Sequence, residues 1–300
     1  MSGLNSLIVS VLQRLPRSVV RPFALRYIAG ERLEDAIKAV KYLHSMQIMG
    51  TIDVLGEDVK TSEQAREAAA AYEEVLHAIH DNRLNANLSI KLTQFGLKID
   101  EGFCYSSVRD LVRMATQYQN FVRIDMEDSS TTSATLTLYE RLRAEGLDRV
   151  GVVIQASLRR SAADVEQLIR RIGNVRLCKG AYVEPESIAF TGREEIRQNF
   201  IKLLRRLFET GCYVGIATHD EVLVQGAYRS IEEMKVERGA YEFQMLHGVR
   251  PRLRGEILRA GHRMRVYVPF GKEWYGYAMR RFKENPQIAR YVLRALFSKD

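Results

Sequence analysis

Short continuous runs of apolar residues recur along the chain, each about as long as a buried strand. Most are rich in Val and Ile and lack the alternation of a strand with one solvated face. That pattern is typical of parallel strands covered on both faces. The eight runs are Met49–Val54, Leu88–Leu92, Phe121–Met126, Val150–Gln155, Val175–Cys178, Tyr213–Ala217, Tyr241–Leu246 and Met264–Val268.

Segments with helical character separate these runs, so the chain alternates between strand and helix. They are Ser62–His80, Gly102–Tyr118, Thr131–Glu145, Ala162–Ile172, Glu194–Thr210, Val222–Glu237 and Pro251–Gly261. Repeated βα units indicate a parallel sheet, either open and doubly wound or closed into a (βα)8 barrel. Eight units without a Pro/Gly-rich joint favour an α/β protein with a TIM-like barrel. We expect an N-terminal helical arm over residues 1–42 and a barrel catalytic domain over residues 43–300.

Composition places few further limits on the chain. With 300 residues, 46% of them hydrophobic, an ample core is expected. Cys104, Cys178 and Cys212 are scattered and odd in number, which argues against a disulfide framework and predicts a reducing, cytoplasmic compartment. The longest early apolar stretch, Leu7–Leu12, is too short for a membrane span.

The positive charge is concentrated near the C-terminus. Residues 250–300 hold 13 Lys/Arg against 4 Asp/Glu, although the whole chain carries only +8. Such a stretch suits an anionic ligand, an anionic membrane surface or nucleic acid. No helix-turn-helix, zinc-finger or RNA-binding pattern accompanies it, so we do not expect nucleic acid as a partner.

Polar residues stand where the apolar runs end, which is where a (βα)8 barrel carries its chemistry. They are Lys91, Asp125, Gln155, Arg176, Lys179, Thr218, His219, Gln244 and Tyr267. Singly, each has a structural alternative: a snorkelling lysine, a helix-capping aspartate, a satisfied core amide or a structural histidine. Together they predict a polar rim around one site. Asp125, Glu127 and Asp128 lack further ligands from other strands, so no metal site is expected.

One face of a C-terminal helix carries Tyr277, Arg280, Arg281 and Glu284 at i, i+3, i+4 and i+7. Two guanidinium groups beside a tyrosine can bind a small carboxylate and cover an apolar group. The alternative is a solvated face on which Arg280 and Glu284 form an ordinary ion pair.

Several cofactor motifs are absent: a strand followed by GxGxxG, a P-loop, HExxH and GxSxG. Even so, Arg176, Lys179 and the backbone around Gly180 and Ala181 could bind an anionic cofactor. Gly180 would permit a close approach to the backbone.

Six segments, taken together and in this order, resemble the proline dehydrogenase family over about Thr51 to Glu284. They are Ile90-Lys91-Leu92-Thr93-Gln94, Arg123-Ile124-Asp125-Met126-Glu127, Val175-Arg176-Leu177-Cys178-Lys179-Gly180-Ala181-Tyr182, Ala217-Thr218-His219, Glu242-Phe243-Gln244-Met245-Leu246-His247-Gly248 and Tyr277-x-x-Arg280-Arg281-x-x-Glu284. The resemblance implies a distorted (βα)8 flavoenzyme that oxidises L-proline to Δ1-pyrroline-5-carboxylate, the first step of proline catabolism to glutamate. It implies hydride transfer to N5 of FAD and a membrane quinone as electron acceptor.

The resemblance also implies roles for single residues. Lys91, Arg280 and Arg281 would bind the proline carboxylate, and Tyr267, Tyr277 and Leu246 would pack on the ring. Asp125 would belong to the hydrogen-bond network that supports Lys91, and Arg176 would lie close to flavin N5. FAD would be held by Met126, Gln155, Arg176, Lys179, Gly180, Ala181, Thr218 and His219.

Longer bifunctional relatives carry an aldehyde dehydrogenase domain and a DNA-binding module, which this chain lacks. We therefore expect a monofunctional enzyme whose product passes to a separate pyrroline-5-carboxylate dehydrogenase, with at most a transient contact. In those relatives an aromatic residue follows the equivalent of Tyr182, whereas this chain has Val183. Peripheral contact with the membrane, through the basic C-terminal region or the apolar segment Leu4–Leu15, is a further hypothesis.

Charge balance predicts one more residue of the site. Two arginines and a lysine around an empty site would repel one another, and Glu57 follows the first strand at the same rim. We expect Glu57 to pair with Arg280 or Arg281 as a gate over bound substrate. Two other functions remain open: a flavin-free lyase or aldolase with a Schiff-base lysine, Lys91 or Lys179, and a non-catalytic basic module.

Overall fold

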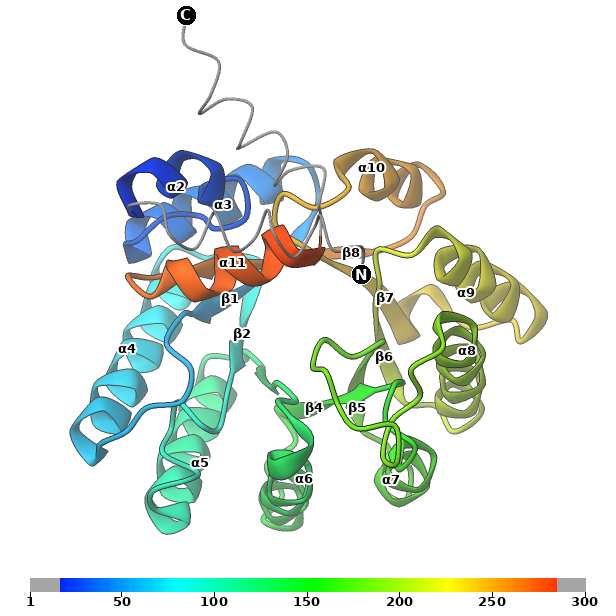
Figure 1. Cartoon of the computed structure of the whole chain (residues 1–300), viewed down its shortest axis with the longest axis horizontal. Helices are drawn as coiled ribbons and strands as arrows, with labels where there is room; N and C mark the ends of the chain where they lie inside the picture. The colour runs from blue at the N-terminus through cyan, green and yellow to red at the C-terminus, as the bar shows by residue number, and fades with distance from the viewer. Residues whose placement is uncertain (1–16, 285–300) are drawn as a thin grey trace, which may run out of the picture.

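Eight parallel strands close into a barrel, in which each strand pairs with the next along the chain and β8 pairs with β1. The structure, a computed structural model, describes residues 17–284, and of Val19, Lys283 and Glu284 it describes only the backbone. The predicted α/β barrel is confirmed (Figure 1). The strands are β1 (Met49–Val54), β2 (Ala86–Ile90), β3 (Val122–Ile124), β4 (Val150–Gln155), β5 (Asn174–Cys178), β6 (Tyr213–Ala217), β7 (Tyr241–Leu246) and β8 (Met264–Phe270).

The predicted strand ends differ from the observed ones by a few residues. β2 and β3 stop at Ile90 and Ile124, and the Asp125 N–H still donates to the Ile90 carbonyl at 2.8 Å. Lys91 and Asp125 therefore lie just beyond the paired strands. Their side chains need not point alternately to the two faces of the sheet, as those of strand residues do.

Helices that follow the first seven strands cover the outside of the barrel. They are α4 (Ser62–Asp81), α5 (Glu101–Gln117), α6 (Ser129–Ala144), α7 (Ser161–Leu168), α8 (Arg193–Glu209), α9 (Glu221–Glu233) and α10 (Pro251–Arg259). The side chains of Asp100, Asp128 and Asp220 cap α5, α6 and α9 by accepting a hydrogen bond from a free backbone N–H. The predicted helix Ala162–Ile172 is too long, because α7 ends at Leu168 and i→i−3 bonds close its last turn.

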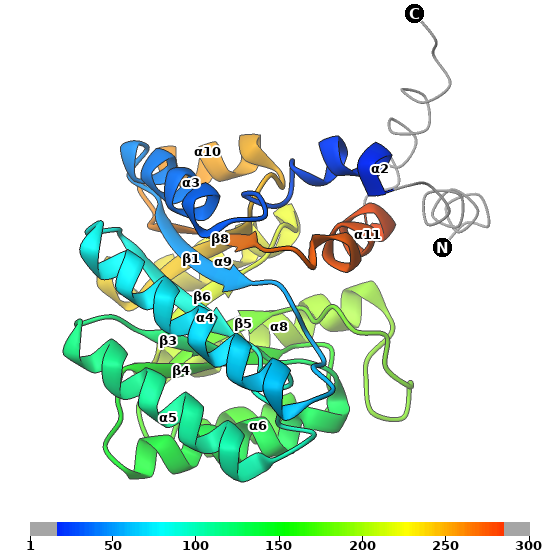
Figure 2. The ribbon, with the colours of Figure 1, turned by 90° about the vertical axis from the view of Figure 1, so that its left-hand side faces the viewer.

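The barrel departs from the regular plan next to β8. A helix of the N-terminal region, α3 (Leu33–Ser45), packs outside β1 and β8, where the last helix of a regular barrel would lie. The helix that follows β8, α11 (Trp274–Glu284), instead packs against α2 (Arg17–Ala24). Figure 2 shows these two helices at the end of the barrel toward which β1 points.

Two clusters of buried apolar side chains pack the strands and helices together. The large one joins the strand interiors to the inner faces of the surrounding helices. The small one joins α2 and the turn after it to α11, with Tyr27 edge-on to Phe282 at 6.1 Å between ring centroids. Between residues 17 and 284, no helix is both long enough and apolar enough to cross a membrane.

Candidate active site

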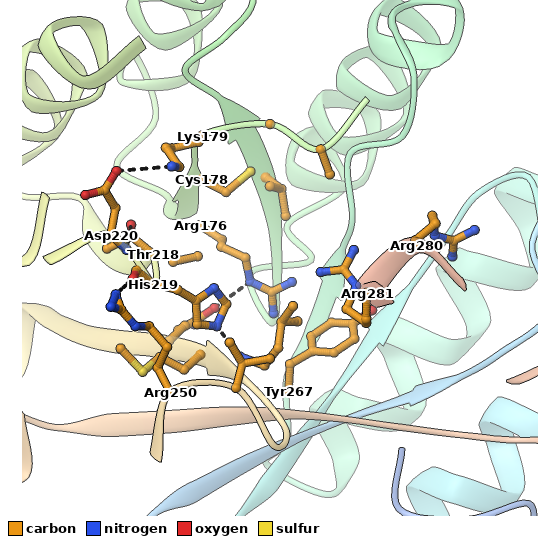
Figure 3. A pocket seen from close by; sticks show the side chains of 18 of the residues that line it. Arg176, Cys178, Lys179, Thr218, His219, Asp220, Arg250, Tyr267, Arg280 and Arg281 are labelled. Atoms are coloured by element: carbon orange, nitrogen blue, oxygen red, sulfur yellow. Dashed lines mark hydrogen bonds and ion pairs between the residues drawn. The ribbon is translucent and has the colours of Figure 1, made fainter. Parts of the chain in front are cut away.

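The carboxyl ends of the strands surround a cavity of about 1020 Å³ (Figure 3). Among the described residues that line it, nine are Lys or Arg and four are Asp or Glu. More than half of the chain's net charge of +8 is therefore concentrated here. Such an excess of cations favours anionic ligands, and the volume is at the upper end of ordinary ligand sites.

Lys91 follows β2 and is 8% exposed. Its Nζ donates to Asp53 Oδ1 at 2.7 Å and to Tyr267 Oη at 3.2 Å, while Glu57 Oε1 and Asp125 Oδ2 lie at 3.7 and 4.0 Å. Burial alone would lower the pKa of Lys91, but these carboxylates, Asp53 foremost, hold it well above its ordinary value. The ammonium group is thus charged at neutral pH, which suits it to bind a carboxylate.

Asp125 connects Lys91's neighbours to Arg176. Its Oδ1 accepts hydrogen bonds from Ser89 at 2.7 Å and from Arg176 Nη1 at 2.5 Å, and its Oδ2 accepts one from Tyr267 Oη at 2.8 Å. Arg176 also donates from Nε to Gln244 Oε1 at 2.5 Å. A buried guanidinium and a buried carboxylate thereby compensate each other and are fixed in place.

Helix α11 contributes Tyr277, Arg280 and Arg281 to the cavity wall. Tyr277 is only 7% exposed, and the guanidinium carbons of Arg280 and Arg281 lie 5.9 and 5.2 Å from its ring centroid. Arg280 Nη2 donates to Glu57 Oε1 at 2.8 Å. This face of α11 therefore borders the cavity and is not the solvated face that the sequence left open as an alternative. The side chain of Glu284 lies outside the described part of the structure.

A second cationic group lies at the ends of β5 and β6. Asp220 accepts hydrogen bonds from Lys179 at 3.2 Å and from Arg197 at 2.8 and 3.0 Å, and Arg193 approaches to 3.7 Å. Burial alone would raise the pKa of Asp220, but the hydrogen bonds from Arg197 and Lys179 hold it well below its usual range. The carboxylate gathers three cations on one side of the cavity. Figure 3 shows its contact with Lys179.

His219 is neutral at physiological pH. Burial lowers its pKa to about 4, and the positive charges of Arg281, Lys179 and Arg250 act in the same direction. Its Nε2 accepts a hydrogen bond from the Leu246 N–H at 2.9 Å. The imidazole therefore fixes the end of β7 and carries no charge into the cavity.

Gly180 turns the chain sharply after β5, with φ at +109°. A Cβ at this position would lie 2.1 Å from Ser157 Oγ and 3.3 Å from Gln155 Oε1. A side chain is thus excluded by both conformation and space.

The structure brings nearly all the predicted site residues to one cavity. Its lining includes Glu57, Lys91, Asp125, Met126, Arg176, Lys179, Gly180, Ala181, Thr218, His219, Leu246, Tyr267, Tyr277, Arg280 and Arg281. Gln155 does not line it; this side chain lies behind Gly180 and donates to the Glu127 carbonyl at 2.8 Å. No group of three metal-binding side chains occurs among the described residues.

Sequence reasoning missed several residues of the site. Asp53 is the nearest carboxylate to Lys91, yet it lies inside an apolar run instead of at its end. A charged residue within a buried strand was an available signal. Arg193 and Arg197 lie on a helix whose charged residues resemble a solvated face, and Arg26 and Tyr27 reach the cavity from the N-terminal arm.

Comparison with known proteins agrees with this geometry. The family profile described as proline dehydrogenase matches residues 36–293. The chain belongs to the proline dehydrogenase family. The resemblance carried by the six segments is thereby confirmed.

Two members of the proline dehydrogenase family are similar over nearly their whole length. Proline dehydrogenase 1 of Bacillus subtilis (strain 168) is 37% identical over 276 residues, which are 92% of this chain and 91% of that protein. Proline dehydrogenase of Deinococcus radiodurans is 34% identical over 289 residues, 95% and 93% of the two chains.

Among solved structures, the chain resembles proline utilization A from Bdellovibrio bacteriovorus inactivated by N-propargylglycine. The TM-score is 0.84 and the identity 25%, over 89% of this chain and 33% of that one. The barrel corresponds to one part of that longer protein.

Proposed function

We propose that the protein oxidises L-proline to Δ1-pyrroline-5-carboxylate, with FAD as cofactor and a membrane quinone as electron acceptor. Family membership supports the reaction. One observation carries the proposal to this chain: Lys91, Arg280 and Arg281 meet Tyr267 and Tyr277 in one cavity. Arg176 and Lys179 line the same cavity.

The residues present fit a flavin dinucleotide. The cavity is large, and the cations gathered by Asp220, namely Lys179, Arg193 and Arg197, suit a diphosphate. Gly180 leaves the backbone open to close approach. Met126, Arg176, Lys179, Gly180, Ala181, Thr218 and His219 would hold FAD. Gln155 would support Gly180 from behind.

Proline offers one carboxylate, one amine and three ring methylenes. Lys91, Arg280 and Arg281 would bind the carboxylate through charge-assisted hydrogen bonds, and Tyr267, Tyr277 and Leu246 would enclose the ring. Because polar anchors stand at one end and apolar walls around the ring, only one orientation satisfies both. Fixed orientation is the protein's main contribution to a hydride transfer.

When bound, FAD would supply the two-electron chemistry, as the acceptor of a hydride from C5 of the substrate. Arg176 brings a buried positive charge, which would favour negative charge developing on the cofactor. Asp125 holds that guanidinium and the Tyr267 hydroxyl in place, so we assign it a positioning and electrostatic part in catalysis.

Glu57 would act as a gate. Its ion pair with Arg280 connects the loop after β1 to α11 across the cavity mouth, as the charge argument predicts. The gating role itself stays a prediction.

The charge of Lys91 argues against this residue as the Schiff-base lysine of the aldolase alternative. A Schiff-base lysine must lose its proton before it attacks a carbonyl, whereas Lys91 is surrounded by carboxylates that keep it protonated.

The visible absorption spectrum of the purified protein, recorded before and after anaerobic addition of L-proline, tests the proposal. Flavin bands that bleach with L-proline but not with D-proline are expected. A colourless protein that cannot be reconstituted with FAD would refute the cofactor, and bands that persist would refute the substrate.

The electron acceptor requires a separate test. We expect quinone reduction to need contact with a bilayer, and a separate dehydrogenase to consume the product. The segment Leu4–Leu15 and the residues after 284 lie outside the described part of the chain. Deleting residues 4–15 should lower quinone reductase activity while activity with a soluble dye persists; equal loss of both would contradict this role.

A further inference from the structure

Behind Lys91, on the side away from the cavity, lies a carboxylate that no part of the proposed reaction uses. Asp53 stands on β1, is 0% exposed and does not line the cavity. Its Oδ1 lies 2.7 Å from Lys91 Nζ, which is the shortest polar contact of that ammonium group. Asp53 therefore cannot touch a ligand, but it touches the group that would.

The three N–H bonds of the Lys91 ammonium group can be assigned from these distances. One points to Asp53, and a second points to the Tyr267 hydroxyl at 3.2 Å. On the cavity side, the third N–H has among the described residues only the carboxylates of Glu57, at 3.7 Å, and Asp125, at 4.0 Å, which are both beyond ordinary hydrogen-bonding distance. Two tethers inside the barrel thus leave one donor directed at the cavity.

Asp53 is itself held from the outer layer of the barrel. The hydroxyl of Tyr72, on α4, lies 3.2 Å from Asp53 Oδ1 and 3.2 Å from Gln94 Oε1, and accepts the Val54 N–H at 3.2 Å. Tyr72 is fully buried and its ring packs against that of Phe95 in a tilted arrangement, with 5.4 Å between ring centroids. This packing fixes the hydroxyl, and hence the carboxylate, without help from solvent.

A purely structural role does not account for a carboxylate at this position. Asp53 Oδ2 is buried and has no hydrogen-bond partner among the described residues, so the strand carries an incompletely compensated charge. An apolar side chain would fill the same place in a parallel strand more favourably. Burial raises the pKa of Asp53 to about 6, which still leaves it ionised at neutral pH beside a charged Lys91.

We propose that Asp53, held by Tyr72, is the positioning residue that fixes the Lys91 ammonium group and directs its free donor toward the substrate carboxylate. The proposal rests on the proposed function, because it takes the ligand of Lys91 to be a carboxylate. A flexible lysine loses side-chain freedom when it binds; Asp53 removes that freedom beforehand, so the substrate meets an ordered donor.

The direction in which Asp53→Asn changes carboxylate binding distinguishes this positioning role from a simple electrostatic effect. If Asp53 acted only as a nearby negative charge, Asp53→Asn would tighten carboxylate binding, because a repulsion would be lost. If Asp53 is a tether, the same change weakens binding. Tetrahydrofuran-2-carboxylate, which has the shape of proline but lacks the amine, is a suitable probe, and its dissociation constant follows from the change in the flavin spectrum of the holoenzyme.

We expect Asp53→Asn to weaken binding of this probe and to raise KM for proline by roughly tenfold, with flavin content unchanged. In a Lys91→Met background the same substitution should change binding by less than about twofold, because the group that it positions is absent. Tyr72→Phe, which removes only the hydroxyl, should weaken binding to a smaller extent and likewise only when Lys91 is present. Asp58→Asn is the matched control, because Asp58 is an exposed aspartate in the loop that follows β1 and pairs there with Lys98.

Tighter or unchanged binding in Asp53→Asn, or an equal loss with and without Lys91, overturns the proposal. If Asp53→Asn does not fold, Tyr72→Phe is compared with and without Lys91→Met instead. An equal loss of probe binding in both backgrounds, or no loss, overturns the proposal. Failure of the proposed function has a different signature: the unaltered holoenzyme then neither binds the probe nor bleaches with L-proline.

Discussion

Glu57 Oε1 lies 2.8 Å from Arg280 Nη2, and this ion pair connects the loop after β1 to the helix after β8. The two segments are the first and last to leave the barrel, and they meet because β1 and β8 are neighbours in it. Arg280 is half-exposed and Glu57 is largely covered. The contact is therefore at the mouth of the cavity, where it can open without disturbing the core.

Glu57→Gln should open this mouth. We expect KM for proline to rise by up to about tenfold and the free energy of unfolding to change by less than about 1 kcal/mol, because partly exposed ion pairs contribute little to stability. Iodide should quench the flavin fluorescence more strongly in the variant. Asp58→Asn serves as the control, and unchanged KM together with unchanged quenching would remove Glu57 from the site.

Arg281→Met should impair substrate binding more severely. Arg281 lines the cavity beside Tyr277, and a charge-assisted hydrogen bond contributes about 1.5–3 kcal/mol, so KM should rise roughly tenfold to a hundredfold. Flavin content should be unchanged. Lys272→Met, which removes an exposed cation from the turn before α11, tests whether loss of charge alone is responsible. A similar rise in KM for both variants would contradict a direct role of Arg281.

Lys179→Met should weaken the hold on the cofactor instead. Lys179 reaches the cavity from the end of β5 and is bound to Asp220 at 3.2 Å. Loss of one charged contact predicts about a tenfold higher dissociation constant for FAD, measured by reconstitution of the apoprotein. Lys202→Met on the exposed face of α8 is the matched control. If FAD binds equally to both variants, the cationic group around Asp220 does not serve the cofactor.

The barrel could be predicted from the sequence, because continuous apolar runs and intervening helices are local patterns. The arrangement of the helices beside β8 could not be predicted in this way. Both α3 and α11 are amphipathic, and only tertiary packing decides which of them covers β1 and β8. Tyr277, Arg280 and Arg281 on α11 face the cavity because α3 already occupies the position outside the barrel.

The site was predictable where polar residues end a strand, and not where they lie within one. Lys91 and Asp125 follow β2 and β3, so their place at the rim follows from the strand ends. Asp53 and Tyr72 are both buried, and their contact joins β1 to a residue of α4 that lies nineteen positions later in the chain. No pattern of period two or 3.6 indicates that pairing, because it depends on how α4 is rotated against the sheet.

His219 should make the stability of the fold depend on pH. Its pKa of about 4 in the folded chain lies below the ordinary value of 6.5. The unfolded chain therefore takes up the proton first as the pH falls, so the stabilisation is complete above about pH 6.5 and is lost progressively toward pH 4. For a difference of this size, the loss at about pH 4.5 is roughly 2 kcal/mol.

His219→Gln isolates this contribution, since the Gln amide oxygen can still accept the Leu246 N–H. The difference in unfolding free energy between wild type and variant, measured by urea denaturation at a fixed FAD concentration, should shift by roughly 2 kcal/mol against the wild type between neutral pH and about pH 4.5. His44→Gln, at an exposed position on α3, should leave the pH dependence as it is in the wild type. A constant difference between wild type and His219→Gln would mean that His219 keeps an ordinary pKa, and it would then carry positive charge into the cavity in acid.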